Sequence, residues 1–328
     1  MHQSTRSWWI LSDALLEVDN LRTHYFTRQG TTNAVDNVSF RLLQGQTLGI
    51  TGESGCGKST LAHSIIRLLP PSAKVVSGTI SYKGLDLVKA SELDLRKIRW
   101  RRISLIFQAA MNALNPVRRV GEQVSEAITY HEGTTKGEAR RRTKRLFELV
   151  GLDPVRMNDY PHEFSGGMRQ RIVIAMAIAC EPDLIIADEP VTALDVLVQA
   201  QILDLLDSLK KELNISMILI THDLSVVKET CDFVAVMYAG KLVESSTVES
   251  VLKNPHHPYT RALIQALPQI SGGRHSLKSL AGMPPNLIHP PSGCRFHPRC
   301  PFVMDRCRAE EPLLAEHGTN HKSACFLS

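Results

Sequence analysis

The chain has 328 residues and a formal net charge of +5, and 43% of its residues are hydrophobic. This length suffices for about two domains, and the composition is that of an ordinary soluble globular protein. No apolar run reaches the roughly 18 residues that a transmembrane helix needs, which argues against a chain that crosses the bilayer by itself. The first dozen residues lack the apolar segment of a secretory signal, so we expect a cytosolic chain. The charge is too small to indicate a nucleic-acid partner, and we expect none.

The predicted elements alternate between strand and helix at both ends of a helical middle. Short strands are expected at residues 16–18 and 34–42, then a buried strand at 47–51 and a helix from 58 to about 69. Residues 92–180 are charged and helix-forming, most clearly at 137–150. Strands at 184–187 and 217–220 then flank a helix at 196–213. This order predicts an α/β core interrupted by a mostly helical insertion.

The composition changes near residue 254. Prolines become frequent beyond it, strands are no longer predicted, and four of the seven cysteines fall after residue 293. We therefore divide the chain into an N-terminal extension at 1–14, a core at 15–253 with its insertion at about 92–180, and a separate C-terminal appendage at 254–328.

A glycine-rich turn between a predicted strand and a predicted helix matches the phosphate-binding pattern G-x-x-x-x-G-K-S/T. Glycines let successive backbone N–H groups point into one concavity at the helix N-terminus, where they attract phosphate. Lys58 should reach the β- and γ-phosphates, and the Ser59 hydroxyl should bind Mg²⁺. The predicted nucleotide contacts here are Ser54, Gly55, Cys56, Gly57, Lys58, Ser59 and Thr60.

Two later strands end in side chains suited to hydrolysis. An apolar strand delivers Asp188 to its carboxyl end, where a carboxylate can hold Mg²⁺ through water. The adjacent Glu189 is placed to act as general base toward an attacking water, or to orient it. His222 follows the next apolar strand, from which it could contact the γ-phosphate and the water. We predict that Glu189 and His222 are the catalytic residues.

Four further segments, in the right order, resemble the ATPases of the ABC transporter family. Residues 164–171 (FSGGMRQR) resemble its signature segment, and 193–195 (ALD) resemble its D-loop. Gln108 resembles the Q-loop glutamine, and residues 221–223 (THD) resemble the switch-histidine segment. The resemblance covers about residues 15–252.

The resemblance implies a P-loop ABC ATPase core of the α/β class, with an antiparallel β subdomain, an inserted helical subdomain and the small cysteine-containing appendage. It further implies that the chain binds and hydrolyses ATP. Tyr25 lies where the family stacks an aromatic ring on adenine, although the adjacent Phe26 could serve instead. The implied Mg²⁺ ligands are Ser59, Gln108 and Asp188.

The signature segment implies a partner. Its first residues, Ser165, Gly166 and Gly167, open a helix whose N–H dipoles form a second anion site. In the family, two such chains pair head to tail, and each signature segment covers the ATP of the other chain. We expect the partner to be a related but different ATPase chain. The Q-loop implies coupling to membrane subunits.

The C-terminal residues resemble those of dipeptide and oligopeptide importer ATPases, through 254–263 (NPHHPYTRAL) and 293–301 (GCRFHPRCP). This implies a peripheral protein on the cytoplasmic face of the membrane, with two permease subunits as partners and a solute-binding protein as an indirect one. Importers of nickel and other solutes share this segment and stay as alternatives. A soluble ABC ATPase acting on ribosomes or DNA is a further alternative. We interpret the His-Pro-Tyr stretch as a packed helix start.

Four cysteines of the appendage, Cys294, Cys300, Cys307 and Cys325, follow the pattern Cys-x5-Cys-x6-Cys-x17-Cys. Four thiolates suit tetrahedral Zn²⁺ or a 4Fe–4S cluster. Related peptide-importer ATPases include members with an iron–sulphur cluster, and structural zinc sites favour closer pairs. We therefore expect a structural 4Fe–4S cluster, with zinc and free or disulfide-bonded cysteines as alternatives.

Overall fold

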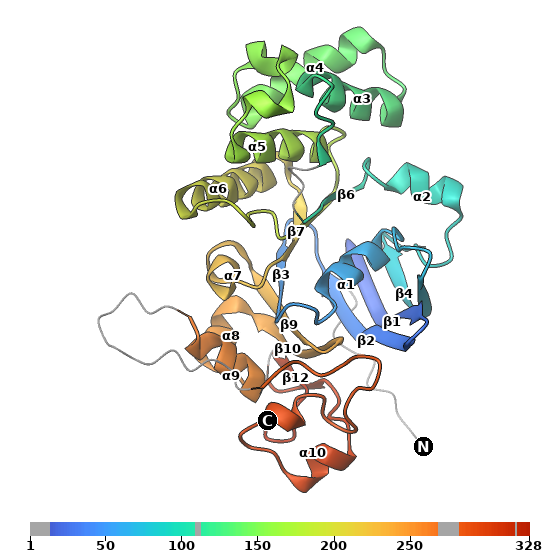
Figure 1. The fold of residues 1–328 in the computed structure, drawn as a ribbon, viewed down its shortest axis with the longest axis vertical. Helices are drawn as coiled ribbons and strands as arrows, with labels where there is room; N and C mark the ends of the chain where they lie inside the picture. Colours follow the sequence, from blue (N-terminus) through green and yellow to red (C-terminus); the bar gives the residue numbers. More distant parts are fainter. Residues whose placement is uncertain (1–13, 109–112, 268–281, 319) are drawn as a thin grey trace.

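The computed structural model of the chain describes residues 14–108, 113–267, 282–318 and 320–328. The predicted N-terminal extension at 1–14 lies outside them except for its last residue. Within the described residues the chain forms two β-sheets, a group of helices at one end of the molecule and a proline-rich segment at the other (Figure 1).

The smaller sheet is antiparallel, with the order β2-β1-β4-β5. It contains β1 (Leu16–Thr27), β2 (Gly30–Leu42), β4 (Ala73–Tyr82) and β5 (Leu85–Asp86). The first two strands are longer than predicted, because they stay paired from Leu16 and Leu42 up to a tight turn at Thr27 and Gly30. Leu16, Val18 and Leu21 of β1 are buried against the rest of the core.

The larger sheet has the order β11-β12-β10-β9-β3-β8-β7-β6, and its central strands are parallel. These are β3 (Thr47–Thr51), β6 (Ile103–Ile106), β7 (Leu184–Asp188), β8 (Ser216–Ile220) and β9 (Phe233–Tyr238). Each reads as a continuous apolar run, since helices cover both faces of a parallel sheet. The covering helices include α1 (Lys58–Ile65), α6 (Val196–Leu213) and α7 (Leu224–Thr230).

The predicted insertion at 92–180 holds the helices at the top of Figure 1. It comprises α2 (Glu92–Ile98), α3 (Val120–Glu132), α4 (Lys136–Leu149), the 3-10 turns η2 (Pro154–Asn158) and η3 (Pro161–Glu163), and α5 (Gly166–Ala177). Ser91 and Thr135 cap two of these helices by accepting a backbone N–H three residues on. Strand β6 lies within the same range but pairs with β7, so the insertion also supplies one strand of the core sheet.

The C-terminal segment lies at the opposite end of the molecule from α3 and α4 (Figure 1). It follows β10 (Lys241–Thr247) and α8 (Val248–Lys253), and contains α9 (Pro258–Gln265), η4 (His297–Arg299), α10 (Asp305–Ala309), β11 (Ala315–Glu316) and β12 (Lys322–Ser323). The sequence predicted no strand here, yet β12 pairs with β10 and extends the main sheet. The appendage therefore shares a sheet with the core.

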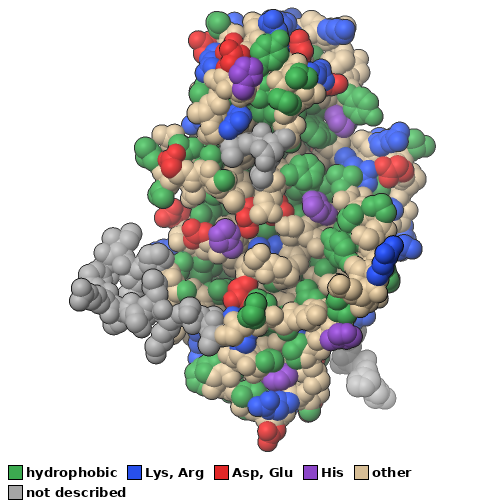
Figure 2. Space-filling model, viewed as in Figure 1, with side chains coloured by type: hydrophobic (Ala, Val, Ile, Leu, Met, Phe, Trp, Pro, Cys, Tyr) green, Lys and Arg blue, Asp and Glu red, His purple; other side chains and the backbone are tan. Residues whose placement is uncertain are grey.

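The surface of the described residues carries both signs of charge. Figure 2 shows lysine and arginine side chains spread among acidic and apolar ones on the face in view. None of the described helices is long and apolar enough to cross a membrane.

Candidate nucleotide-binding site

The phosphate loop connects β3 to α1. Its glycines are needed because the backbone has positive φ angles there and because neighbouring strands leave no room for a Cβ at two of them. Gly52, Gly55 and Gly57 have φ angles of 148°, 77° and 107°, which side chains disfavour. A Cβ on Gly52 would lie 2.1 Å from the carbonyl oxygen of Met237, and one on Gly57 2.0 Å from that of Ala34. The loop therefore turns tightly against β9 and β2.

Lys58, the first residue of α1, folds back over this loop. Its ammonium group is buried and donates to the carbonyl oxygens of Gly52 at 2.6 Å and Glu53 at 3.0 Å. Ser54 and Gly55 are exposed at the tip of the loop, whereas Cys56 is buried. Burial raises the pKa of the Cys56 thiol, so it stays neutral at physiological pH. This favours a packing role for Cys56 over a redox one.

Tyr25 reaches the same region from β1. Its hydroxyl lies 3.4 Å from the Thr60 hydroxyl in the first turn of α1, and its side chain is partly exposed. Phe26 is 48% exposed and points elsewhere on the strand, since alternate residues face opposite sides of a sheet. The strand thus brings Tyr25, rather than Phe26, beside the loop.

The carboxylate at the end of β7, that of Asp188, shows whether the site has suitable ligands for Mg²⁺. Asp188 is 2% exposed, and its buried Oδ1 has no hydrogen-bond partner in the described structure. Burial raises the pKa of Asp188, and a hydrogen bond with the Ser59 side chain opposes that shift. A buried carboxylate oxygen without a partner beside a hydroxyl suits a hard cation with oxygen ligands. The two residues fit Mg²⁺.

The Glu189 carboxylate is held by three other side chains of the site. Its Oε1 lies 3.1 Å from Nδ1 of His222, and its Oε2 accepts from Nε2 of Gln108 at 3.1 Å and from the Thr192 hydroxyl at 2.9 Å. Its φ of 48° is unusual for a residue with a side chain. Burial raises the pKa of Glu189, but the bonds from His222 and Thr192 outweigh it and lower the pKa overall. Glu189 is therefore a carboxylate at neutral pH.

The structure thus brings three separate sequence predictions into one cluster, since Gln108 follows β6, Glu189 follows β7 and His222 follows β8. Carboxyl ends of parallel strands meet at one edge of a sheet. Sequence reasoning missed Thr192, which carries no signal beyond its position three residues after Glu189. Gln108 bonds Glu189 here, and its role as an Mg²⁺ ligand stays a prediction.

The signature segment lies in the helical subdomain. Ser165 caps α5 by accepting the N–H of Met168 at 3.4 Å, and Gly166 and Gly167 are its first two residues. A Cβ on Gly167 would lie 2.5 Å from Cγ1 of Val198 in α6. Ser165 is exposed. Among the described residues, the side-chain hydrogen bonds of this segment stay within the helical subdomain.

Two known protein families match this chain, one over its core and one over its C-terminal segment. A family profile named ABC transporter matches residues 35–192, and one named Oligopeptide/dipeptide transporter, C-terminal region, matches residues 243–307. The dipeptide transport ATP-binding protein DppD of Bacillus subtilis (strain 168) is 48% identical over 318 residues, which cover 96% of this chain and 95% of that protein. The chain belongs to the ATP-binding proteins of the ABC transporter family.

Further relatives support this membership. The oligopeptide transport ATP-binding protein OppD of Escherichia coli (strain K12) is 45% identical, over 96% of this chain and 94% of its own length. A dimeric post-hydrolysis structure of the ATP-binding cassette MJ0796 with ADP and phosphate superimposes with a TM-score of 0.64 at 27% identity. The superposition covers 71% of this chain and 98% of the MJ0796 chain. The predicted ABC ATPase fold is confirmed, and an ABC ATPase of this kind hydrolyses ATP.

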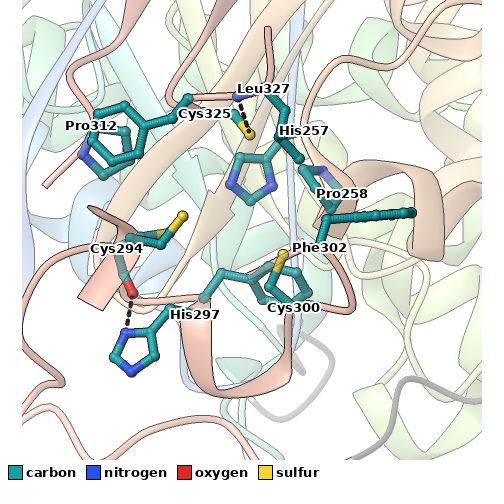
Figure 3. Close-up of a pocket in the computed structure, with 12 residues that line it drawn as sticks. His257, Pro258, Cys294, His297, Cys300, Phe302, Pro312, Cys325 and Leu327 are labelled. Atoms are coloured by element: carbon teal, nitrogen blue, oxygen red, sulfur yellow. Dashed lines mark hydrogen bonds between the residues drawn. The ribbon is translucent and has the colours of Figure 1, made fainter. Parts of the chain in front are cut away.

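The predicted 4Fe–4S cluster is wrong. Cys294, Cys300, Cys307 and Cys325 do line one cavity (Figure 3), but no group of three or more His, Cys, Asp or Glu side chains in the described residues could hold a metal ion. The described residues therefore offer no site for zinc either. Burial raises the pKa of Cys294 to about 11 and also raises that of Cys300, so both thiols are neutral at physiological pH. The relatives, too, are named only as ATP-binding proteins.

The described cysteines form no disulfide either, so all four are free thiols. The packed helix start at the His-Pro-Tyr stretch is present. His257 caps α9 by accepting the N–H of Tyr259 at 3.1 Å, and Pro258 occupies the first turn. Burial lowers the pKa of His257 to about 3, so its imidazole is neutral.

Proposed function

We propose that this chain is the energy-coupling ATPase of a membrane importer of dipeptides or oligopeptides. The cluster of Gln108, Glu189 and His222 beside the phosphate loop supports the hydrolytic part. The solute class is supported by relatives named for dipeptide and oligopeptide transport, which match nearly the whole chain, including its C-terminal segment.

In the proposed reaction, the loop N–H groups and Lys58 bind the phosphates of ATP. Glu189 takes a proton from the attacking water, while His222 and Gln108 orient its carboxylate. Ser59 and Asp188 would hold Mg²⁺, which neutralises charge on the transferred phosphate when bound. A lowered pKa makes Glu189 a modest base, and the hydrogen bonds that hold its carboxylate in place compensate for this by keeping the water in line.

We further propose that the complete site needs a second ATPase chain, which is related to this one but not identical to it. The side-chain hydrogen bonds that the described residues of the signature segment make stay within the helical subdomain, and Ser165 is exposed. The solved relative MJ0796 is described as dimeric. In a head-to-tail pair, Ser165, Gly166 and Gly167 of one chain would cover the ATP of the other.

The other proposed partners are two permease subunits, which would hold the ATPase at the cytoplasmic face of the membrane, and indirectly a solute-binding protein. The test is uptake of a labelled dipeptide, a labelled pentapeptide and nickel by a strain that lacks this chain. Peptide uptake should be lost, and it should return with the wild-type chain but not with Glu189→Gln.

Two results would overturn the proposed solute or class. Normal peptide uptake with lost nickel uptake would assign the chain to nickel import. Recovery of the purified chain on ribosomes, without membrane proteins, would place it among soluble ABC ATPases.

A further inference from the structure

The second residue of the phosphate loop, Glu53, is held by two side chains from the C-terminal segment. Arg299 donates from Nη1 to Oε2 of Glu53 at 2.6 Å and from Nη2 to Oε1 at 2.9 Å. The backbone N–H of Glu53 donates to the hydroxyl of Tyr259 at 2.8 Å. The C-terminal segment therefore holds both the backbone and the carboxylate of one loop residue.

These contacts are built on buried aromatic side chains. The Arg299 side chain is 5% exposed, and its Nη1 also donates to the Tyr238 hydroxyl at 3.3 Å. The rings of Tyr238 and Tyr259 are 4.7 Å apart, and that of Phe296 lies 5.2 Å and 5.5 Å from them. Rings packed in this way restrict the positions that Arg299 and Tyr259 can take.

This aromatic layer separates the phosphate loop from the cysteine-lined cavity. Phe296 lines the cavity, together with His257, Pro258 and Cys300 (Figure 3). Arg299 ends η4, which lies between Cys294 and Cys300 in the sequence. The packing of the cavity thus determines where the guanidinium of Arg299 is presented to the loop.

The charge of Glu53 gives these contacts a consequence for binding. A carboxylate in a loop that binds triphosphate repels its ligand unless a cation neutralises it. Arg299 supplies that cation through a bidentate pair, which also fixes the direction of the carboxylate. Lys58 is the cation that the loop itself supplies. In the described structure its ammonium group donates to the backbone carbonyl oxygen of Glu53 and not to the Glu53 carboxylate.

We propose that Arg299 is a positioning residue of the ATP site, which acts through the Glu53 carboxylate to set the charge of the phosphate loop, while Tyr259 holds the backbone of the same residue. The C-terminal segment is then part of the nucleotide site and not only a mark of the transported solute. This inference concerns ATP binding alone, so its failure would leave the proposed peptide import untouched, and the reverse holds as well.

The test measures ATP affinity of the purified full-length chain with a fluorescent ATP analogue, beside its thermal midpoint. Arg299→Gln leaves the Glu53 charge uncompensated and should weaken ATP binding about tenfold. The double variant Glu53→Gln/Arg299→Gln removes both charges and should bind within about twofold of wild type. Arg306→Gln, which removes an exposed arginine of the same segment, is the matched control and should leave ATP affinity unchanged.

A merely structural role predicts the opposite pattern, in which the double variant binds as weakly as Arg299→Gln or more weakly. That result, or wild-type affinity in Arg299→Gln, would overturn the proposal. If Arg299→Gln folds poorly, the ATP affinity of Arg299→Lys tests the proposal instead. It keeps the charge and should bind ATP within about threefold of wild type, and a tenfold loss there would count against the proposal.

Discussion

The imidazole Nδ1 of His222 lies 3.1 Å from Oε1 of Glu189, on the side of the carboxylate opposite to Gln108 and Thr192. The two residues are 33 positions apart in the sequence. They meet because β7 and β8 are parallel neighbours and both end at the same edge of the sheet. The contact with His222 sets the direction of the Glu189 carboxylate. Substituting Glu189 is therefore the most direct test of the proposed hydrolytic site.

Glu189→Gln should keep ATP binding and lower the rate of phosphate release about 10²- to 10⁴-fold, because the amide cannot accept a proton from water. Phosphate release and binding of a fluorescent ATP analogue separate the two effects. Glu229→Gln, at an exposed position, is the control and should hydrolyse ATP normally. A Glu189→Gln variant with a normal rate would remove Glu189 from the catalytic role.

Asp188→Asn should raise the Mg²⁺ concentration needed for hydrolysis about tenfold or more, because the neutral amide is a weaker ligand for a hard cation. A magnesium titration of ATP hydrolysis measures this shift. Asp204→Asn, an exposed change on α6, should leave the titration where it is. An unchanged midpoint in Asp188→Asn would contradict the assignment of this carboxylate to Mg²⁺.

Gly57→Ala should weaken ATP binding at least about tenfold, because its Cβ would lie 2.0 Å from the Ala34 carbonyl oxygen at a φ of 107°. Gly137→Ala is the matched control. It lies in α4, where a new Cβ would meet nothing within 4 Å apart from its chain neighbours and the backbone of its own helix, and it should stabilise the chain by up to about 1 kcal/mol. Thermal midpoints and ATP affinities of both variants test the pair, and equal affinities would contradict the requirement for glycine at 57.

Glu132→Gln should lower the free energy of unfolding by about 1 kcal/mol at pH 7, the upper range for a pair that solvent reaches. Hydrogen bonds from Arg142 lower the pKa of Glu132 below its usual 4.5, despite partial burial. A lowered folded-state pKa means that this contribution is complete above about pH 4.5, the ordinary value, and is lost as pH falls through the folded value. The difference from wild type should therefore shrink as the pH falls below about 4.5.

Urea unfolding at several pH values measures the Glu132 effect. Glu126→Gln, in the same helix and in an exposed pair with Arg118, should change stability by less than about 0.5 kcal/mol. A Glu132 effect that is constant with pH would show that its ionised form is not responsible.

Glu244→Gln should lower the free energy of unfolding by about 2–4 kcal/mol. The Glu244 carboxylate is fully buried and accepts the backbone N–H groups of His256 at 2.7 Å and His257 at 3.0 Å, while Nε2 of His321 lies 2.7 Å from it. An amide would turn a donor toward these donors. Chemical denaturation should detect the loss, whereas Glu249→Gln, which is exposed, should be nearly neutral. Equal stabilities would contradict this role.

Much of the core could be predicted because its signals are local. Helix α6 spans the predicted residues 196–213, and the strands that carry Asp188 and His222 lie within one residue of their predicted bounds. A strand with a continuous apolar run, or a turn rich in glycine, can be recognised from residues that are close together in the sequence. The lengths of β1 and β2 could not be predicted in this way, because cross-strand pairing extends them through polar residues.

The cysteine spacing led to a wrong prediction for a related reason. Spacing shows that four thiols can approach one cavity, and they do line one. Whether they can hold a metal depends on the direction of each side chain, which the packing of the whole segment determines.

The sequence by itself was enough to predict the residues of the nucleotide site, since the phosphate loop, Asp188, Glu189 and His222 stand in short motifs at strand ends. Only the tertiary structure decided how that site is supported. Thr192 and Gln108 hold Glu189, and Arg299 reaches Glu53 across 246 positions. Such contacts depend on the packing of whole elements, and neither partner carries a periodic or local pattern that indicates the other.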